Sequence, residues 1–151
     1  MKLIIQRVDQ AAVQVEGKCV GEIGRGFLIL VGIGEHDTKE LADKMLDKAL
    51  KLRIFEDENG KTNLSLAQIN GELLIVSQFT LYANCKKGHR PSFTEAGNPE
   101  LANELYKYML EQAKAYSHKV ESGVFGAHMS VSLTNNGPFT IILDSKELFG
   151  V

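Results

Sequence analysis

The continuous apolar run GFLILVGI, over residues 26–33, constrains the fold of this chain more than any other stretch. A short run without polar side chains predicts a strand that is buried on both faces of a sheet. Three strand-like segments precede it, KLIIQRV, AAVQVEG and KCVGEI, separated by short polar or glycine-containing breaks. The N-terminal third of the chain is therefore predicted to consist of strands.

Two amphipathic helices are predicted further along the chain. The first has Asp37 as its capping residue and ends near Leu52, because apolar residues recur between them with helical spacing. The second begins at Asn98-Pro99, an N-cap residue followed by proline at the first helical position, and extends to about Tyr116. Each helix is expected to pack one apolar face on the sheet.

The other segments are predicted to be strands and turns. Asn59-Gly60 indicates a tight turn, and NGELLIVSQFTLYA indicates a strand with an apolar middle. Residues 127–134 alternate between apolar and polar, and SLTNNGPFTIIL (132–143) reads as a hairpin with Gly137-Pro138 at its tip. The order of elements predicts an α+β fold, a strand-rich single domain over residues 1–151 with two main helices on a largely antiparallel, barrel-like sheet. Exposed strand edges make dimerisation through sheet elements an expectation.

Composition narrows the classes of function. A chain of 151 residues suits one compact domain, and no apolar run is long enough to span a membrane, so a cytoplasmic protein is expected. The formal net charge of -2 argues against DNA binding through extensive phosphate contacts, although a local basic patch remains compatible with it. The two cysteines and four histidines show no ligand spacing, and we expect no metal.

The segment GIGEHD resembles a dinucleotide-binding turn only in part. Gly32 and Gly34 end a strand before a helix, but the third glycine position is occupied by Asp37, where a pyrophosphate has to approach. We therefore expect no cofactor.

Polar residues within an apolar strand are the first candidates for a site. Ser77, Gln78 and Thr80 either satisfy neighbouring backbone groups or form a polar site where the strand ends. A Ser or Thr nucleophile requires an activating base, and the chain has no GxSxG signature. The residues alone leave both readings open.

The segment NCKKGHRPSF supplies the second group of candidates. Lys86, Lys87 and Arg90 are suited to phosphate groups, and Phe93 is suited to stacking on a base. The alternative is an ordinary solvated loop. For Gly137-Pro138, a trans hairpin turn and a cis bond in a tight turn are both possible.

Six segments, taken in order, carry a resemblance to a known family. They are IQRV (5–8), LRIFED (52–57), VSQFTL (76–81), KKGHRPSF (86–93), GVFGAHM (123–129) and NNGPFT (135–140). Together they resemble the D-aminoacyl-tRNA deacylase family, of the type common in bacteria and eukaryotes, over essentially the whole chain. Asn136 stands where this family often has Asp, and Phe139 stands where Val is common, whereas the Gly-Pro pair is retained.

The resemblance implies a cytoplasmic homodimer that hydrolyses the ester of D-aminoacyl-tRNA at the acceptor end, and of glycyl-tRNA. It implies that Gly137-Pro138 is cis and excludes L-aminoacyl esters from the partner subunit's active site. Backbone N–H groups around Gln78 and Phe79 are the expected oxyanion donors, with a ribose hydroxyl of the tRNA assisting. The expected catalytic residues are Ser77, Gln78, Phe79 and Thr80, of which Thr80 has the weaker role of shaping the pocket. The residues expected to bind substrate are Asn136, Thr140, Lys86, Lys87, Arg90 and Phe93.

Two other functions remain as alternatives at this stage. One is an esterase that acts on small molecules through Ser77 or Thr80 as nucleophile, and an acyl-enzyme intermediate would distinguish it. The other is a non-enzymatic RNA-binding module that uses the basic loop.

Overall fold

The computed structural model describes all residues from Met1 to Val151. The main sheet contains six strands, β1 (Lys2–Val15), β2 (Lys18–Ile23), β3 (Gly26–Gly32), β6 (Glu72–Ser77), β7 (Val120–Ser122) and β8 (Ser130–Asp144). Strands β4 (Phe55–Glu56) and β5 (Thr62–Leu64) form a separate hairpin. The helices are α1 (Lys39–Leu50), α2 (Pro99–Ala113) and the short α3 (Ser145–Phe149), with a 3-10 helix, η1, at Phe79–Tyr82. None of these helices has the length and apolar character required to cross a membrane.

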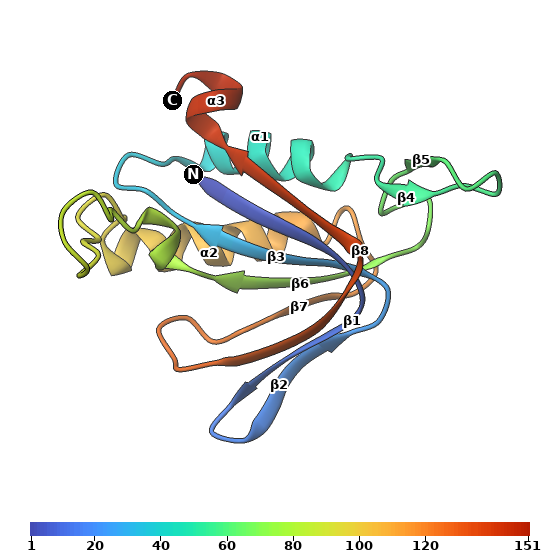
Figure 1. The fold of residues 1–151 in the computed structure, drawn as a ribbon, viewed down its shortest axis with the longest axis horizontal. Helices are drawn as coiled ribbons and strands as arrows, with labels where there is room; N and C mark the ends of the chain where they lie inside the picture. The colour runs from blue at the N-terminus through green and yellow to red at the C-terminus, as the bar shows by residue number, and fades with distance from the viewer.

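The sheet is mixed and curls toward a barrel. Its strand order is β2-β1-β3-β6-β7, and β8 pairs with β1. Strand β1 is antiparallel to β2, β3 and β8, whereas β3, β6 and β7 are parallel to one another. Helices α1 and α2 are the crossovers that parallel pairing requires. Figure 1 shows β1, β2 and β8 bending away from the region that α1 and α2 cover. The predicted α+β class and strand-rich, barrel-like sheet are confirmed.

The core explains why β3 is apolar throughout. Phe27 and Ile29 belong to the large cluster between the sheet and the helices, which also contains Met45 of α1 and Met109 of α2. Leu28 belongs to a second cluster on the opposite face. Strand β3 is thus buried on both faces, as the apolar run predicts.

Strand β1 differs from its prediction, since it is one strand of 14 residues rather than two. Asp9 and Gln10, which resemble a polar break, are exposed but stay in the strand. The strand continues through them because β8 pairs with β1 along most of its length. Long-range pairing therefore overrides a local break signal.

Strand β6 and the two long helices end earlier than predicted. Strand β6 ends at Ser77, so Gln78 and Thr80 follow it in a turn that becomes η1. Helix α2 begins at the predicted Asn98 cap, whose side chain accepts from the Leu101 N–H, and it ends at Ala113. Helix α1 ends at Leu50 rather than Leu52.

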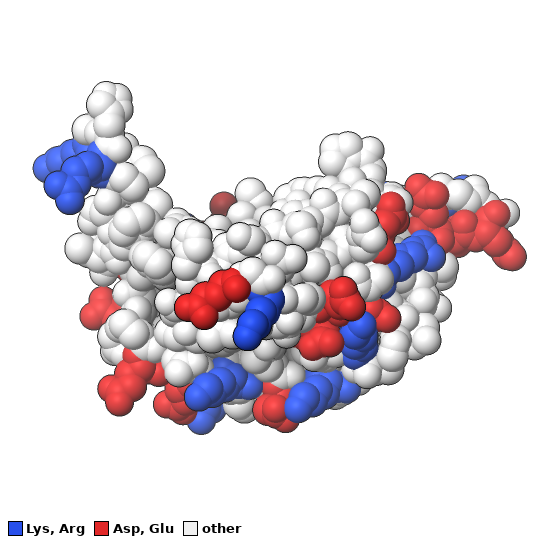
Figure 2. All heavy atoms as spheres, turned by 90° about the horizontal axis from the view of Figure 1, so that it is seen from below, with Lys and Arg blue, Asp and Glu red and all other residues white.

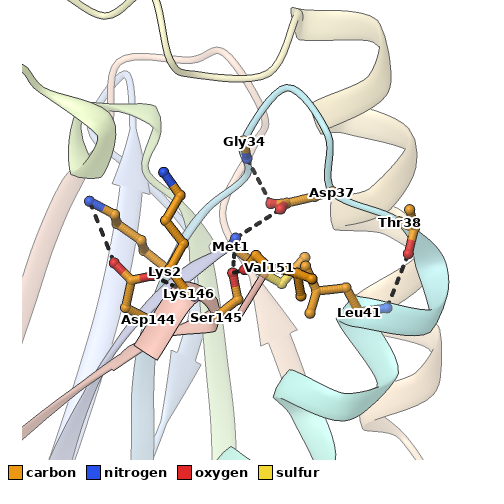
Figure 3. Close-up of polar contacts among 10 residues, drawn as sticks. All are labelled: Met1, Lys2, Gly34, Asp37, Thr38, Leu41, Asp144, Ser145, Lys146 and Val151. Atoms are coloured by element: carbon orange, nitrogen blue, oxygen red, sulfur yellow. Dashed lines mark hydrogen bonds and ion pairs between the residues drawn. The ribbon is translucent and has the colours of Figure 1, made fainter. Parts of the chain in front are cut away.

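The N-cap residue of α1 is Thr38 and not the predicted Asp37, because the Asp37 carboxylate accepts hydrogen bonds from other groups (Figure 3). The Met1 ammonium donates to Asp37 Oδ1 (2.8 Å) and to Ser145 Oγ (2.8 Å). The Gly34 N–H donates to Asp37 Oδ2 (2.7 Å). This ion pair is buried, with side-chain exposures of 0% for Met1 and 8% for Asp37, and it fixes the turn between β3 and α1.

Strand β8 corrects the predicted hairpin at Gly137-Pro138. Both halves of the segment belong to one strand that runs antiparallel to β1. Thr140 pairs with Gln6 and Asn135 pairs with Val8, so residues 136–139 bulge out of the ladder opposite Arg7. We call residues 136–139 the β8 bulge. The turn residues interrupt the strand locally without reversing the chain.

Candidate functional site

A cavity of about 670 Å³ opens where β3 and β6 end. Because these strands are parallel, their carboxyl ends meet at the same edge of the sheet, and the crevice outside such ends is the usual place for a ligand. The wall is completed by residues 76–79, by most of the 93–99 segment that leads into α2, and by residues 125–129 before β8. Eleven of the 19 lining residues are hydrophobic, which suits an apolar or aromatic group with a few polar contacts.

Three of the four predicted catalytic residues line this cavity. They are Ser77, Gln78 and Phe79, whereas Thr80 lies outside the lining and its hydroxyl accepts a hydrogen bond from the Gln78 side-chain amide. The Gln78 N–H donates to the Val31 carbonyl (2.7 Å). Phe79 is 58% exposed, and its ring contacts the ring of Phe93 edge-on, with centroids 5.1 Å apart.

A nucleophile with an activating base is not evident in the cavity. His128 is the only lining residue with an ionisable imidazole, carboxyl or amino group. No hydrogen bond joins its imidazole to Ser77 or Thr80, and no carboxylate orients it. The geometry therefore lacks the nucleophile–base–orienter chain that side-chain nucleophilic catalysis uses.

Tyr106 packs against the cavity wall and is not among the site residues predicted from the sequence. Its hydroxyl, on the buried face of α2, donates to the Ile75 carbonyl in β6 (2.7 Å). Burial raises the pKa of Tyr106 to about 12, which keeps the hydroxyl protonated as a donor. Its ring also lies 6.1 Å from that of Phe125 in the cavity wall. In the sequence, the only indication that Tyr106 packs against the cavity is its place on the apolar face of the predicted helix.

Close backbone packing fixes the wall that leads into α2. A Cβ atom on Gly97 would lie 2.9 Å from the Gly34 carbonyl oxygen, so the two backbone segments meet without a side chain between them. The Gly97 N–H donates to the Ile33 carbonyl (2.9 Å). The turn that Asp37 holds is thus in direct contact with the cavity wall.

A basic loop lies beside the cavity. Asn84 and Ser92 exchange two backbone hydrogen bonds (2.7 and 3.0 Å) and close the loop between them. Lys86, Lys87 and Arg90 project from it, are exposed, and form none of the ion pairs in the structure. Figure 2 shows blue side chains on the protrusion at the left end of the molecule, where Figure 1 places the loop after η1. These cations are free to bind phosphate groups.

Gly137 and Pro138 lie apart from this cavity within one chain. Their peptide bond is cis, as expected. Both residues are exposed in the β8 bulge, together with Asn136, and Thr140 follows the bulge in the strand. None of these four residues lines the cavity. The expected site residues therefore fall into a cavity group, with the basic loop next to it, and a separate bulge group.

Comparison with known proteins finds relatives of one family over nearly the whole chain. Residues 4–144 match the family described as D-Tyr-tRNA(Tyr) deacylase. Proteins named D-aminoacyl-tRNA deacylase from Thermosipho africanus and Lactobacillus acidophilus are each 56% identical to the chain, covering 99% and 95% of it and 100% and 99% of their own lengths.

Two solved structures share the fold. The c-Myc DNA Unwinding Element Binding Protein superposes with a TM-score of 0.90 at 43% identity, covering 96% of this chain and 99% of its own. A probable eukaryotic D-amino acid tRNA deacylase superposes with a TM-score of 0.83 over 94% of this chain and 97% of its own; at 20% identity, this likeness concerns the fold alone.

Proposed function

The chain belongs to the D-Tyr-tRNA(Tyr) deacylase family, and from this premise we propose that it hydrolyses the ester between a D-amino acid and the terminal adenosine of tRNA. The observation that carries the proposal is the cavity at the end of β6, which has Ser77, Gln78 and Phe79 in its wall and the basic loop beside it. The aminoacylated acceptor end of a tRNA suits both parts of this arrangement. Its terminal base and aminoacyl group suit the cavity, and its phosphate backbone suits the basic loop.

Backbone groups stabilise the charge that develops on the ester oxygen. The Gln78 N–H is engaged with Val31, which leaves the first N–H groups of η1, those of Phe79 and Thr80, as the proposed oxyanion donors. Water is the nucleophile, and the vicinal ribose hydroxyl of the tRNA assists its attack. This division of roles accords with a cavity that lacks a nucleophile–base pair.

The basic loop holds the acceptor end through its phosphates. Lys86, Lys87 and Arg90 form no internal ion pairs and are available to a polyanion, and Phe93 connects the loop to the cavity wall. Contacts of this kind position the substrate without reading its sequence.

A homodimer brings the bulge group to the cavity group. Strand β8 has 15 residues, pairs only with β1, and leaves its other edge unpaired with Leu133 and Ile142 exposed. A free edge of this length favours pairing with a second copy. In the proposed dimer, Gly137-Pro138 of one subunit lies beside the Ser77–Thr80 segment of the other and blocks the side chain of an L-amino acid. Glycine has no side chain to exclude, so glycyl-tRNA is also hydrolysed.

Release of amino acid from D-Tyr-tRNA and L-Tyr-tRNA tests the proposal. The wild type is expected to hydrolyse the D-ester far faster than the L-ester, and Phe79→Ala in the cavity wall is expected to slow this reaction. Phe149→Ala, which truncates an exposed phenylalanine on α3, is the matched control and should leave the rate unchanged. Equal rates on the two esters, or an acyl-enzyme that accumulates in a burst, would contradict the proposal.

A further inference from the structure

The β8 bulge is held by one buried guanidinium. Arg7 in β1 is 7% exposed, and each of its three nitrogens donates one hydrogen bond. Nε donates to the Asn136 carbonyl (3.0 Å), Nη2 to Asn136 Oδ1 (3.2 Å) and Nη1 to the Ile54 carbonyl (2.7 Å). The Asn136 carbonyl belongs to the peptide group that leads into Gly137, so these bonds orient the entry to the Gly-Pro pair.

Phe139 covers the face of the same guanidinium. The centre of its ring lies 4.6 Å from Arg7 Cζ, within the range of a cation–π contact. Hydrogen bonds therefore fix the edge of the guanidinium, and the ring of Phe139 fixes its face. Since Asn136 and Phe139 flank Gly137-Pro138 directly, both ends of the pair are tied to Arg7.

Asn136 also connects the bulge to a second residue of β1. Its side-chain amide donates to Asp9 Oδ1 (2.8 Å), while its side-chain oxygen accepts from Arg7. Only an amide can perform both roles, because a carboxylate at this position could accept from Arg7 but would face the Asp9 carboxylate with no proton to donate. Asn136 thus holds the bulge between Arg7 and Asp9.

A third contact fixes the exit from the pair. The Phe139 N–H donates to Asn135 Oδ1 (2.8 Å), and the Asn135 amide donates to Gln6 Oε1 and Thr140 Oγ1 (2.9 Å each). The exposed Gly-Pro pair is consequently anchored on both sides by side chains that pack beneath it.

We propose that Asn136 and Phe139 are positioning residues for Gly137-Pro138, acting through Arg7 and Asp9, and that they set the ratio of D-ester to L-ester hydrolysis. This inference rests on the proposed function. Neither residue lines the cavity of its own chain, so their effect is on the position of the excluding turn and not on the chemistry of the ester. They determine how closely an L-amino acid is excluded, whereas Ser77 to Thr80 determine how fast a bound ester reacts.

Two variants test the two contacts separately. Phe139→Leu removes the ring over Arg7, and Asn136→Asp removes the amide donor to Asp9 with almost no change in shape. Each is expected to lower the D/L ratio of kcat/KM about tenfold, mainly through faster hydrolysis of L-Tyr-tRNA. Phe139→Tyr keeps an aromatic face and should retain most of the wild-type ratio.

Phe149→Leu is the matched control, because it removes a phenylalanine ring whose centre lies 5.9 Å from Lys44 Nζ, on α3 beyond the C-terminal end of β8 (Figure 1). It should leave the D/L ratio unchanged. If Phe139→Leu and Asn136→Asp lower the unfolding temperature but keep the wild-type ratio, the two residues are structural only and the inference fails. If the wild type itself does not distinguish D-Tyr-tRNA from L-Tyr-tRNA, the proposed function fails as well.

Discussion

Substitution of Gly137 by alanine tests the proposed excluding role of the Gly-Pro pair most directly. Gly137 has φ +135°, a conformation that residues with a Cβ atom rarely adopt. An added Cβ would lie 3.0 Å from the Phe139 nitrogen and 3.2 Å from Arg7 Nη2. Neither neighbour moves freely, since the Phe139 N–H is bonded to Asn135 and Arg7 makes three hydrogen bonds.

The expected cost follows from this geometry. A non-glycine residue in a sparsely populated backbone region costs about 1–3 kcal/mol if the turn is kept. Because the turn is exposed, it can instead shift outward, so the loss of stability is limited while the position of the pair changes. A loss of about 1.4 kcal/mol in discrimination lowers the D/L ratio tenfold, and we expect a fall of this size or larger.

The assay combines kcat/KM on D-Tyr-tRNA and L-Tyr-tRNA with thermal unfolding. Gly60→Ala is the matched control, because Gly60 also has a positive φ (+73°) but no atom lies within 4 Å of its added Cβ. This control should lose stability and retain the D/L ratio. The reasoning is refuted if Gly137→Ala is destabilised like Gly60→Ala and still discriminates as well as the wild type.

Four further predictions concern binding, chemistry and stability. Neutralising Lys86, Lys87 and Arg90 together should raise KM and reduce the slope of log KM against log salt by about 0.7–0.9 for each phosphate group that the loop no longer neutralises; an unchanged slope would make the loop ordinary surface. Thr80→Ala should retain kcat within about tenfold, whereas removal of a side-chain nucleophile typically costs ~10⁶-fold. A tRNA that ends in 2′-deoxyadenosine should be hydrolysed slowly by the wild type. Complete inactivity of a folded Thr80→Ala variant would instead support Thr80 as the nucleophile. Asp37→Ala should lower the free energy of unfolding by about 3–5 kcal/mol in denaturant titrations, because it leaves the buried Met1 ammonium unpaired, and a loss below about 1 kcal/mol would contradict this. The pKa of Tyr106 is raised to about 12, so the stability that its protonated hydroxyl contributes is complete below about pH 10 and is lost as the pH rises toward 12. The free energy of unfolding of Tyr106→Phe should therefore depend less on pH between 10 and 12 than that of the wild type. Identical pH profiles would contradict this prediction.

Elements with strong local signals could be predicted from the sequence. Strand β3 is a short apolar run, and α2 begins where an N-cap residue precedes proline. The cap of α1 could not be assigned in this way, since Asp37 and Thr38 are both good capping residues. The choice between them is made by the Met1 ammonium, which lies 36 positions away in the sequence and occupies the Asp37 carboxylate.

The cavity shows the same limit. SQFTL at the end of β6 marks one wall through polar residues in an apolar segment, and this signal is local. Tyr106 of α2 contacts the cavity wall through the Ile75 carbonyl and the ring of Phe125, and nothing in its own sequence neighbourhood distinguishes it from a core residue. Its role depends on which segments the parallel crossovers bring together.

The Gly137-Pro138 pair could be located in the sequence, but whether it forms a hairpin tip or a bulge within one strand could not be predicted from it. The difference between these two structures matters for the proposed function. A hairpin tip is tied to the protein only at its base, whereas the bulge is anchored by the β1 ladder before and after it. Strand β1 holds the bulge through Gln6, Arg7 and Asp9, while Leu3 and Ile5 of the same strand are fully buried in the core. The turn therefore takes its rigidity from the core through a single strand. A filter that rejects by exclusion requires such rigidity, because an obstacle that yields by the width of a methyl group no longer discriminates between enantiomers.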